Sequence, residues 1–451
     1  MTQKSNTNSS KNYVLPIAIM FALFFMIAFV TGYQNPLGTV IKEMTGGNTL
    51  MSQLGNLANF IAYLAMGIPA GYLLQGKGYR KTAIYAVLVG FSGVFITYLS
   101  GMISDNMVAC TVYLCGALVA GFSMCMLNTV VNPMLNSLGK NQNQGNQLVQ
   151  FGGTCNSLGA TLAPVIVGGL LGGEANSIAS ANPVFFMAMG IFAAAFLVLY
   201  FSKLPEAPAI DSKDKEEKVS LSGALRYRNF LFGVVAIFCY VGIEVGIANM
   251  TMQYLSDSKL VINNNALKSE AIAGTIVGVY WLLMLVGRLV GGLIGGKVSS
   301  RVMLTATSLA AIVFLILGIT SSESIISFIG FSSGNLEFST ANIPLNSIFL
   351  IACGLCTSVM WGAIYNLSVE GLGKYTAVAS GVFMMMVCGG GILPLIQAGI
   401  VDAAGSALAG FWLTVGLAAY LLLYALLLSR PSSKLPLEEE DLYEDGVEVK
   451  A

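Results

Sequence analysis

Long apolar segments alternate with short polar stretches along almost the whole chain. Each apolar segment is close to the roughly 20 residues that an α-helix needs to cross the hydrocarbon core of a bilayer. The pattern predicts twelve membrane-spanning helices, at residues 14–41, 50–75, 82–104, 107–136, 146–173, 183–203, 228–256, 271–296, 301–321, 345–370, 376–401 and 406–429. The expected fold class is therefore an all-α, multi-pass membrane protein.

A polar, charge-dense stretch divides these spans into two groups of six. We predict an N-terminal six-helix bundle at residues 14–203, a cytoplasmic linker at 204–227 and a C-terminal six-helix bundle at 228–429. The flanking segments are a short N-terminal tail at 1–13 and an acidic tail at 430–451. Acidic, weakly apolar tails of this kind are typical of disorder.

The basic residues are unevenly distributed between the connections. If the N terminus is cytoplasmic, one side of the membrane holds Lys77, Arg80, Lys81, Lys140, Lys203, Lys213, Lys215, Lys218, Arg226, Arg228, Lys297, Arg301, Lys374, Arg430 and Lys434. The other side holds only Lys42, Lys259 and Lys268. Cytoplasmic loops carry an excess of Lys and Arg, so both termini are predicted to be cytoplasmic.

The amino-acid composition indicates a membrane protein and gives no sign of a catalytic site. Of the 451 residues, 55% are hydrophobic and only 10% are charged, which is too few charges to cover a soluble protein of this size. Histidine is absent, and with it the commonest general base and metal ligand. With no nucleophile–base pair or metal-ligand set in the sequence, we expect no enzyme, no metal, no cofactor and no nucleic-acid partner.

Two matching turns support the division into halves. Gly71-x5-Lys77-x3-Lys81 follows the second span, and Gly291-x5-Lys297-x3-Arg301 follows the eighth. Glycines permit close helix approach and the cations favour the cytoplasmic side. Internal repeats at this scale are typical of transporters whose two bundles move about a central site.

Glu244 is the acidic residue that lies deepest inside an apolar span. A charge at bilayer depth is costly, so it usually has a partner or a function. Glu244 could take up and release a proton, bind Na⁺ or accept hydrogen bonds from sugar hydroxyls. It could instead form an ion pair that fixes two helices, with Arg288 as the candidate partner. Arg288 could equally extend to the headgroups from its position near the cytoplasmic end of its span.

Four short motifs follow one another in order across both halves. They are Asn128-Thr-Val-Val-Asn132-Pro133, Asn156-Ser-Leu-Gly-Ala, Phe238-Cys-Tyr-Val-Gly-Ile-Glu244 and Gly389-Gly-Gly-Ile-Leu-Pro394. Together they resemble the fucose:proton symporter family of the major facilitator superfamily, over nearly all of the transmembrane core. The resemblance implies two six-helix bundles, alternating access and uptake of a monosaccharide coupled to a cation. It also implies a monomer in the inner membrane of a bacterium.

The chain departs from that family at the residues that matter for coupling. Proton-coupled fucose permeases carry acids in spans one and four, where this chain has Asn35 and Asn128. Glu244 stands where they have an amide. The resemblance therefore leaves both the sugar and the coupling ion, H⁺ or Na⁺, open.

Amides and aromatic side chains inside the spans are the candidates for binding the sugar. Amides both donate and accept hydrogen bonds, which suits a polyol, and aromatic rings can stack on the C–H faces of a sugar. The alternative is ordinary interhelical hydrogen bonding, worth about 1 kcal/mol per contact. The candidates are Gln34, Asn35, Asn128, Asn132, Asn156, Tyr240, Asn249, Gln253, Trp281, Trp361 and Asn366.

The function that the sequence favours is uptake of a hexose or deoxyhexose, with Glu244 coupling it to H⁺ or Na⁺. One alternative is an uncoupled facilitator or exporter of another small polar solute with the same fold. Another is a sugar sensor that binds without transporting, although the chain has no large soluble output domain.

Overall fold

The computed structural model describes residues 13–32, 37, 40–41, 49–171, 177–202, 204–205, 221–256, 269–332 and 335–431. Gln34 and Asn35 lie outside the described residues, as do most of the predicted linker and tails.

The N-terminal bundle contains the first six spans. Its elements are α1 (Val14–Gly32), α3 (Thr49–Ser100), α4 (Asn106–Leu138), α5 (Gln142–Leu171), η1 (Ile178–Ala181) and α6 (Asn182–Phe201). Helix α3 holds two predicted spans, joined at Gly78, whose φ of 74° breaks the helix. Glycine adopts this left-handed conformation without steric cost, which explains the sharp turn inside the Lys77–Lys81 motif.

The C-terminal bundle contains the other six spans. Its elements are α7 (Leu221–Leu225), α8 (Arg228–Ser256), α9 (Ser269–Gly295), α10 (Ser300–Thr320), α11 (Asn346–Thr357), α12 (Met360–Ser368), η2 (Gly373–Tyr375), α13 (Thr376–Met385), η3 (Met386–Cys388), α14 (Gly389–Ala404), η4 (Ala407–Gly410), α15 (Phe411–Leu423) and η5 (Tyr424–Leu428). The predicted spans 345–370 and 376–401 are each built from consecutive helices rather than one continuous helix.

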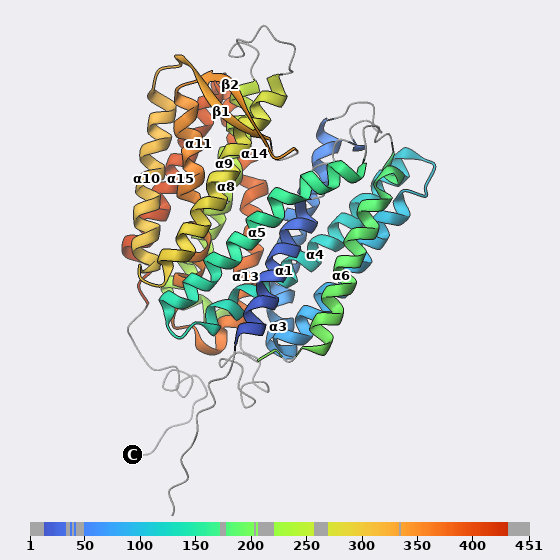
Figure 1. Cartoon of the computed structure of the whole chain (residues 1–451). Helices are drawn as coiled ribbons and strands as arrows, with labels where there is room; N and C mark the ends of the chain where they lie inside the picture. The colour runs from blue at the N-terminus through green and yellow to red at the C-terminus, as the bar shows by residue number, and fades with distance from the viewer. Residues whose placement is uncertain are drawn as a thin grey trace, which may run out of the picture.

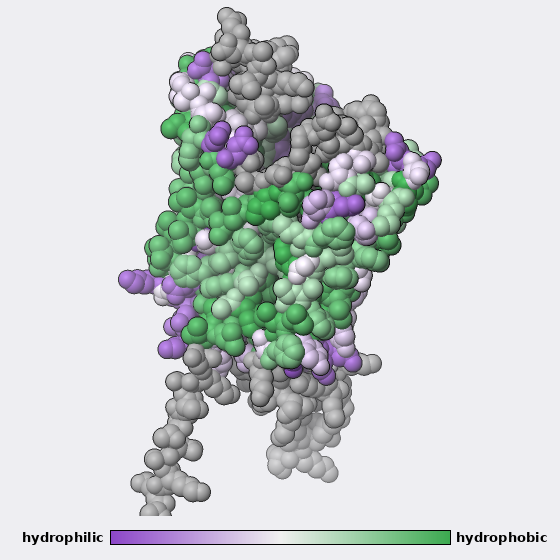
Figure 2. All heavy atoms as spheres, turned by 45° about the vertical axis from the view of Figure 1, so that its right-hand side comes forward, coloured by the Kyte–Doolittle hydropathy of each residue, from purple (hydrophilic) through white to green (hydrophobic). Residues whose placement is uncertain are grey.

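Ten helical stretches of the described residues are long and apolar enough to cross a membrane. One of them, Leu57–Ser100, holds two spans, and α5 adds another, so the described residues form the twelve predicted spans. Large apolar side chains such as Leu64, Phe91 and Leu395 are exposed on the outside of the helices. Figure 2 shows the result: an apolar band around the middle of the molecule, with polar residues gathered toward its two ends. This band is the surface that contacts lipid.

A β-hairpin stands between α10 and α11, where the sequence predicted only a connection. Strands β1 (Ile325–Ser332) and β2 (Glu337–Pro344) pair antiparallel, with Ile325 opposite Pro344 and Ser332 opposite Glu337. The hairpin lies at one end of the molecule, over α9 and the C-terminal bundle (Figure 1). We call this end the hairpin face, and the opposite end, where α1 begins and η5 ends, the terminal face.

The two bundles meet along two helix pairs. In one pair, α5 of the N-terminal bundle packs against α9; in the other, the first span of α3 packs against α13. Figure 1 shows α5 crossing toward the C-terminal bundle near the terminal face. These two contacts position the cavity described next.

Candidate functional site

A cavity of about 460 Å³ lies between the bundles. This volume falls in the range of about 300–1,000 Å³ that is usual for small-molecule sites. Helices α1, α3, α4 and α5 line it on one side, and α8, α9, α12, η3 and strand β1 on the other. Its polar and aromatic lining comprises Phe24, Thr31, Tyr63, Asn128, Gln150, Asn156, Ser157, Thr161, Glu244, Trp281, Arg288, Phe331, Ser358 and Trp361.

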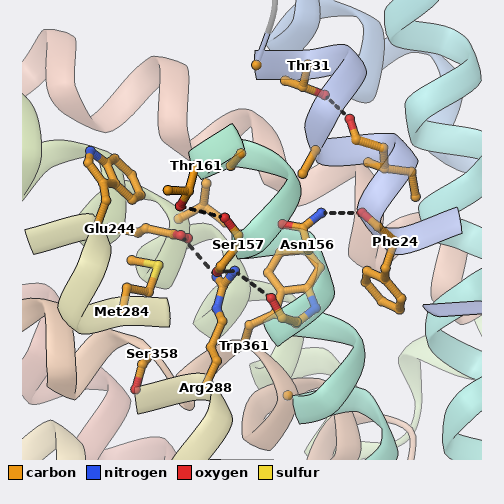
Figure 3. A pocket seen from close by; sticks show the side chains of 18 of the residues that line it. Phe24, Thr31, Asn156, Ser157, Thr161, Glu244, Met284, Arg288, Ser358 and Trp361 are labelled. Carbon is orange, nitrogen blue, oxygen red and sulfur yellow. Dashed lines mark hydrogen bonds and ion pairs between the residues drawn. The ribbon is translucent and has the colours of Figure 1, made fainter. Parts of the chain in front are cut away.

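The charged part of the lining is an ion pair between Glu244 of α8 and Arg288 of α9. Nη2 of Arg288 lies 3.2 Å from Oε1 of Glu244, and the two side chains are 10% and 15% exposed for Arg288 and Glu244 respectively. Of the two alternatives that the sequence left open for Arg288, the structure shows the first: Arg288 is the partner of Glu244 and does not extend to the headgroups. Both charges face the cavity (Figure 3).

Arg288 also reaches the opposite bundle. Its Nη1 donates to the Ser157 hydroxyl at 2.7 Å and to the Gly153 carbonyl at 3.4 Å, both on α5. Figure 3 shows the guanidinium between Glu244 on one side and Ser157 on the other. The same side chain thus pairs a charge within the C-terminal bundle and links that bundle to the N-terminal one.

Tyr240 lies one turn before Glu244 and behind the ion pair. Its ring is fully buried and packs edge-on against Trp361, with 6.2 Å between ring centroids. Its hydroxyl is close enough to Glu244 and Arg288 to interact electrostatically with both charges. Tyr240 therefore supports the charged site from behind rather than lining the cavity.

Cross-bundle hydrogen bonds close the cavity toward the terminal face. The Trp361 indole N–H donates to Oδ1 of Asn132 at 3.1 Å. Below it, the Gln150 amide donates to the Val359 carbonyl at 2.8 Å and the Gln147 amide to the Gly292 carbonyl at 3.0 Å. The floor is therefore built from side chains of one bundle that bond to the other.

Two predicted amides of the N-terminal bundle reach the cavity wall. Nδ2 of Asn128 donates to the Tyr63 hydroxyl at 2.7 Å, and Nδ2 of Asn156 donates to the Phe24 carbonyl at 3.1 Å. These bonds orient both amides on the lining. Asn128, Asn156, Trp281 and Trp361 thus join Glu244 and Arg288 around one space.

The structure places the other candidates elsewhere. Asn132 is buried in the floor, and Asn366 is buried near the terminal face, where it donates to the Ser300 hydroxyl and to the Gln142 carbonyl across the bundle interface. Asn249 and Gln253 are exposed and do not belong to the cavity lining.

Several lining residues were not among the sequence candidates. Tyr63, Gln150, Ser157, Thr161 and Phe331 all face the cavity. For Ser157 a signal existed, because it stands inside the Asn156-Ser-Leu-Gly-Ala motif. Thr161 follows it by one turn of α5, on the same face.

A sequence profile of the Major Facilitator Superfamily matches residues 17–393. The chain belongs to this superfamily. It is therefore a multi-pass membrane transport protein and not an enzyme. The resemblance to sugar permeases of the fucose type is confirmed by the relatives that follow.

The glucose/galactose transporter of Brucella abortus biovar 1 (strain 9-941) is 28% identical over 438 residues, which cover 94% of this chain and 97% of that protein. The L-fucose-proton symporter of Escherichia coli K12 is 21% identical over 425 residues, covering 89% and 90%. The crystal structure of the fucose:proton symporter in the outward conformation superposes with a TM-score of 0.75 at 19% identity, over 92% of this chain and 98% of that one. This last likeness is one of fold.

Proposed function

We propose that this major facilitator protein takes up a monosaccharide by alternating access, coupled to H⁺ or Na⁺. A hexose such as glucose or galactose fits best, because the relative named a glucose/galactose transporter spans nearly the whole chain. The mixed lining of amides, hydroxyls and indole rings suits a sugar, whose ring has both hydroxyl groups and apolar C–H faces.

The observation that carries this proposal is the Glu244–Arg288 pair at the cavity wall. In the state with the pair intact, Arg288 holds Glu244 and, through Ser157, the opposite bundle. A cation that binds Glu244 competes for the carboxylate and weakens its hold on Arg288. Because Arg288 also bonds α5, occupancy of Glu244 is then coupled to the contact between the bundles.

The distribution of charge indicates how the protein is oriented in the membrane. We infer that the terminal face is cytoplasmic, since Lys77, Lys297 and Arg301 lie in the turns on that side. The cavity is closed toward that face by Trp361 and Gln150. The conformation is then the one that receives sugar from outside, in a bacterial inner membrane. We expect the protein to act as a monomer.

An uncoupled facilitator is the second candidate, and one observation favours it. Glu244 is already neutralised by Arg288, so the pair can serve as a fixed brace between α8 and α9. Asn128, which stands where proton-coupled relatives carry an acid, lines the cavity without a titratable group. A facilitator would equilibrate the sugar and would not accumulate it.

Uptake into proteoliposomes separates these functions. Labelled D-glucose, D-galactose and L-fucose are supplied under an inward pH gradient and, separately, under an inward Na⁺ gradient. We expect one gradient to drive accumulation of glucose or galactose; one ion per sugar sustains about 50-fold accumulation per 100 mV. Equilibration without accumulation would favour the facilitator. Binding of a sugar without counterflow would contradict transport and favour a sensor.

A further inference from the structure

The hairpin between α10 and α11 contributes directly to the cavity. Phe331, near the end of β1, lines the cavity and is 6% exposed. Ile329, two residues earlier on the same strand, is 56% exposed. A segment outside the membrane spans thus contributes one buried aromatic residue to the lining of the cavity between the bundles.

The position of Phe331 is fixed by close backbone contact with α9. A Cβ added to Gly278 of α9 would lie 2.0 Å from the Phe331 carbonyl oxygen. On the strand, a Cβ added to Gly330 would lie 2.7 Å from the Thr275 hydroxyl. Glycine on both facing surfaces allows this approach, so the hairpin is seated at one place on α9 (Figure 1).

Phe331 lies at the part of α9 that also carries Trp281. Gly278 and Trp281 both line the cavity and, three residues apart, share one face of α9. Phe338, directly opposite on β2, packs against the Phe331 ring, with 5.2 Å between ring centroids. Phe331 is therefore a buried lining residue whose ring is held in place by a neighbouring ring on β2.

We propose that Phe331 is a specificity-determining residue of the transport site: its ring covers the hairpin end of the cavity, packs on the apolar face of one bound monosaccharide and excludes a second sugar ring. This inference rests on the proposed function. The contact made by Phe331 differs from the amide and ion-pair contacts because the Phe331 ring belongs to the extracellular hairpin and not to a spanning helix.

Competition in proteoliposomes tests the inference. The probe is labelled D-glucose or D-galactose, whichever the wild type transports, with maltose and lactose as competitors. For Phe331→Ala we expect a rise of about tenfold in KM, the loss of one good aromatic contact, and new inhibition by the disaccharides. Ile329→Ala, on the exposed part of the same strand, is the matched control and is expected to behave as wild type.

Two further variants keep the test decisive. Gly278→Ala leaves the Phe331 side chain intact but displaces β1, so it is expected to reproduce the altered selectivity. Phe331→Leu keeps an apolar side chain, gives a smaller rise in KM and replaces the alanine variant if that one folds poorly. Wild-type KM and full exclusion of disaccharides in Phe331→Ala or, in its place, Phe331→Leu would overturn the inference while leaving sugar transport intact. Failure of the wild type to transport any monosaccharide would instead overturn the proposed function.

Discussion

Among the single residues of the site, Arg288 is the one that connects the charged pair to the opposite bundle. Its guanidinium has several donors in a fixed plane, and it uses them on Glu244, on Ser157 and on the Gly153 carbonyl. Lysine, with a single ammonium group, could not make these contacts in the same geometry. The structure therefore explains why an arginine stands at this depth in a span.

Neutralising one member of the pair should destabilise the protein more than neutralising both. Arg288→Gln leaves the Glu244 carboxylate buried without a counter-charge, which typically costs about 3–5 kcal/mol. The double variant Arg288→Gln/Glu244→Gln removes both charges and should regain much of the lost thermal stability. The measurement is the unfolding temperature of the purified proteins in nanodiscs. If the double variant is less stable than Arg288→Gln, the two charges are not paired in the way described.

The sequence predicted Glu244 as a site residue and gave pairing with Arg288 as one of two alternatives for that arginine, but it predicted only part of the polar lining. Glu244 was recognisable because an acid in an apolar span is rare, whereas single hydroxyls are common there. Thr31 and Thr161, for example, simply bond the carbonyls of Ile27 and Ser157 in their own helices. Residue type alone gave no reason to prefer them. Asn249 and Gln253 illustrate the opposite error: five and nine residues beyond Glu244, they lie about 140° and 180° around α8 from it.

Among the helices, close backbone contact between α3 and α13 determines how the two bundles meet. Where α3 crosses α13, a Cβ on Gly67 would lie 2.6 Å from the Met385 Cβ, and a Cβ on Gly381 would lie 2.4 Å from the Gly67 carbonyl. Small residues are what allow membrane helices to approach this closely. The contact holds the terminal side of the cavity closed.

A side chain at this crossing should force the two spans apart. Gly67→Ala is expected to shift the protein toward the state that is open to the terminal face, because the neighbours of the added Cβ, Met385 and Gly381, belong to the opposite bundle. Thiol labelling of Asn146→Cys in a cysteine-free background reports this opening, since Asn146 is fully buried in the closed interface. The matched control is Gly399→Ala on α14, where an added Cβ has nothing within 4 Å. Equal labelling in both variants would show that this crossing does not control the closed state.

Among the elements, spans were predictable and the hairpin was not. The spans follow from segment length and apolar composition, and the turn at Gly78 fell between two predicted spans. The sequence Ile325–Ser332 mixes apolar, serine and glycine residues over eight positions, too short a pattern to separate a strand from a loop. Its pairing with β2 and its seat on α9 depend on tertiary contacts, which the local sequence does not contain.

The whole molecule combines a closed terminal side with a charged site at its centre. Cross-bundle bonds from Gln147, Gln150 and Trp361 form the floor, and Arg288 forms the uppermost of these links beside Glu244. Opening the terminal side requires all of these bonds to break. Arg288 makes its link to Ser157 while it is paired with Glu244 inside the C-terminal bundle, so a cation that binds Glu244 acts on the side chain that makes this link. This places coupling at Glu244 in our account.

Gradient-driven accumulation by Glu244→Gln proteoliposomes tests that central claim most directly. The variant keeps the size of the side chain and removes the charge that binds the cation. The matched control is Glu370→Gln, since Glu370 lies at the end of a span, beyond α12. We predict that wild type and Glu370→Gln concentrate the sugar, whereas Glu244→Gln loses concentration but retains sugar counterflow. Accumulation by Glu244→Gln to the wild-type level would contradict the account.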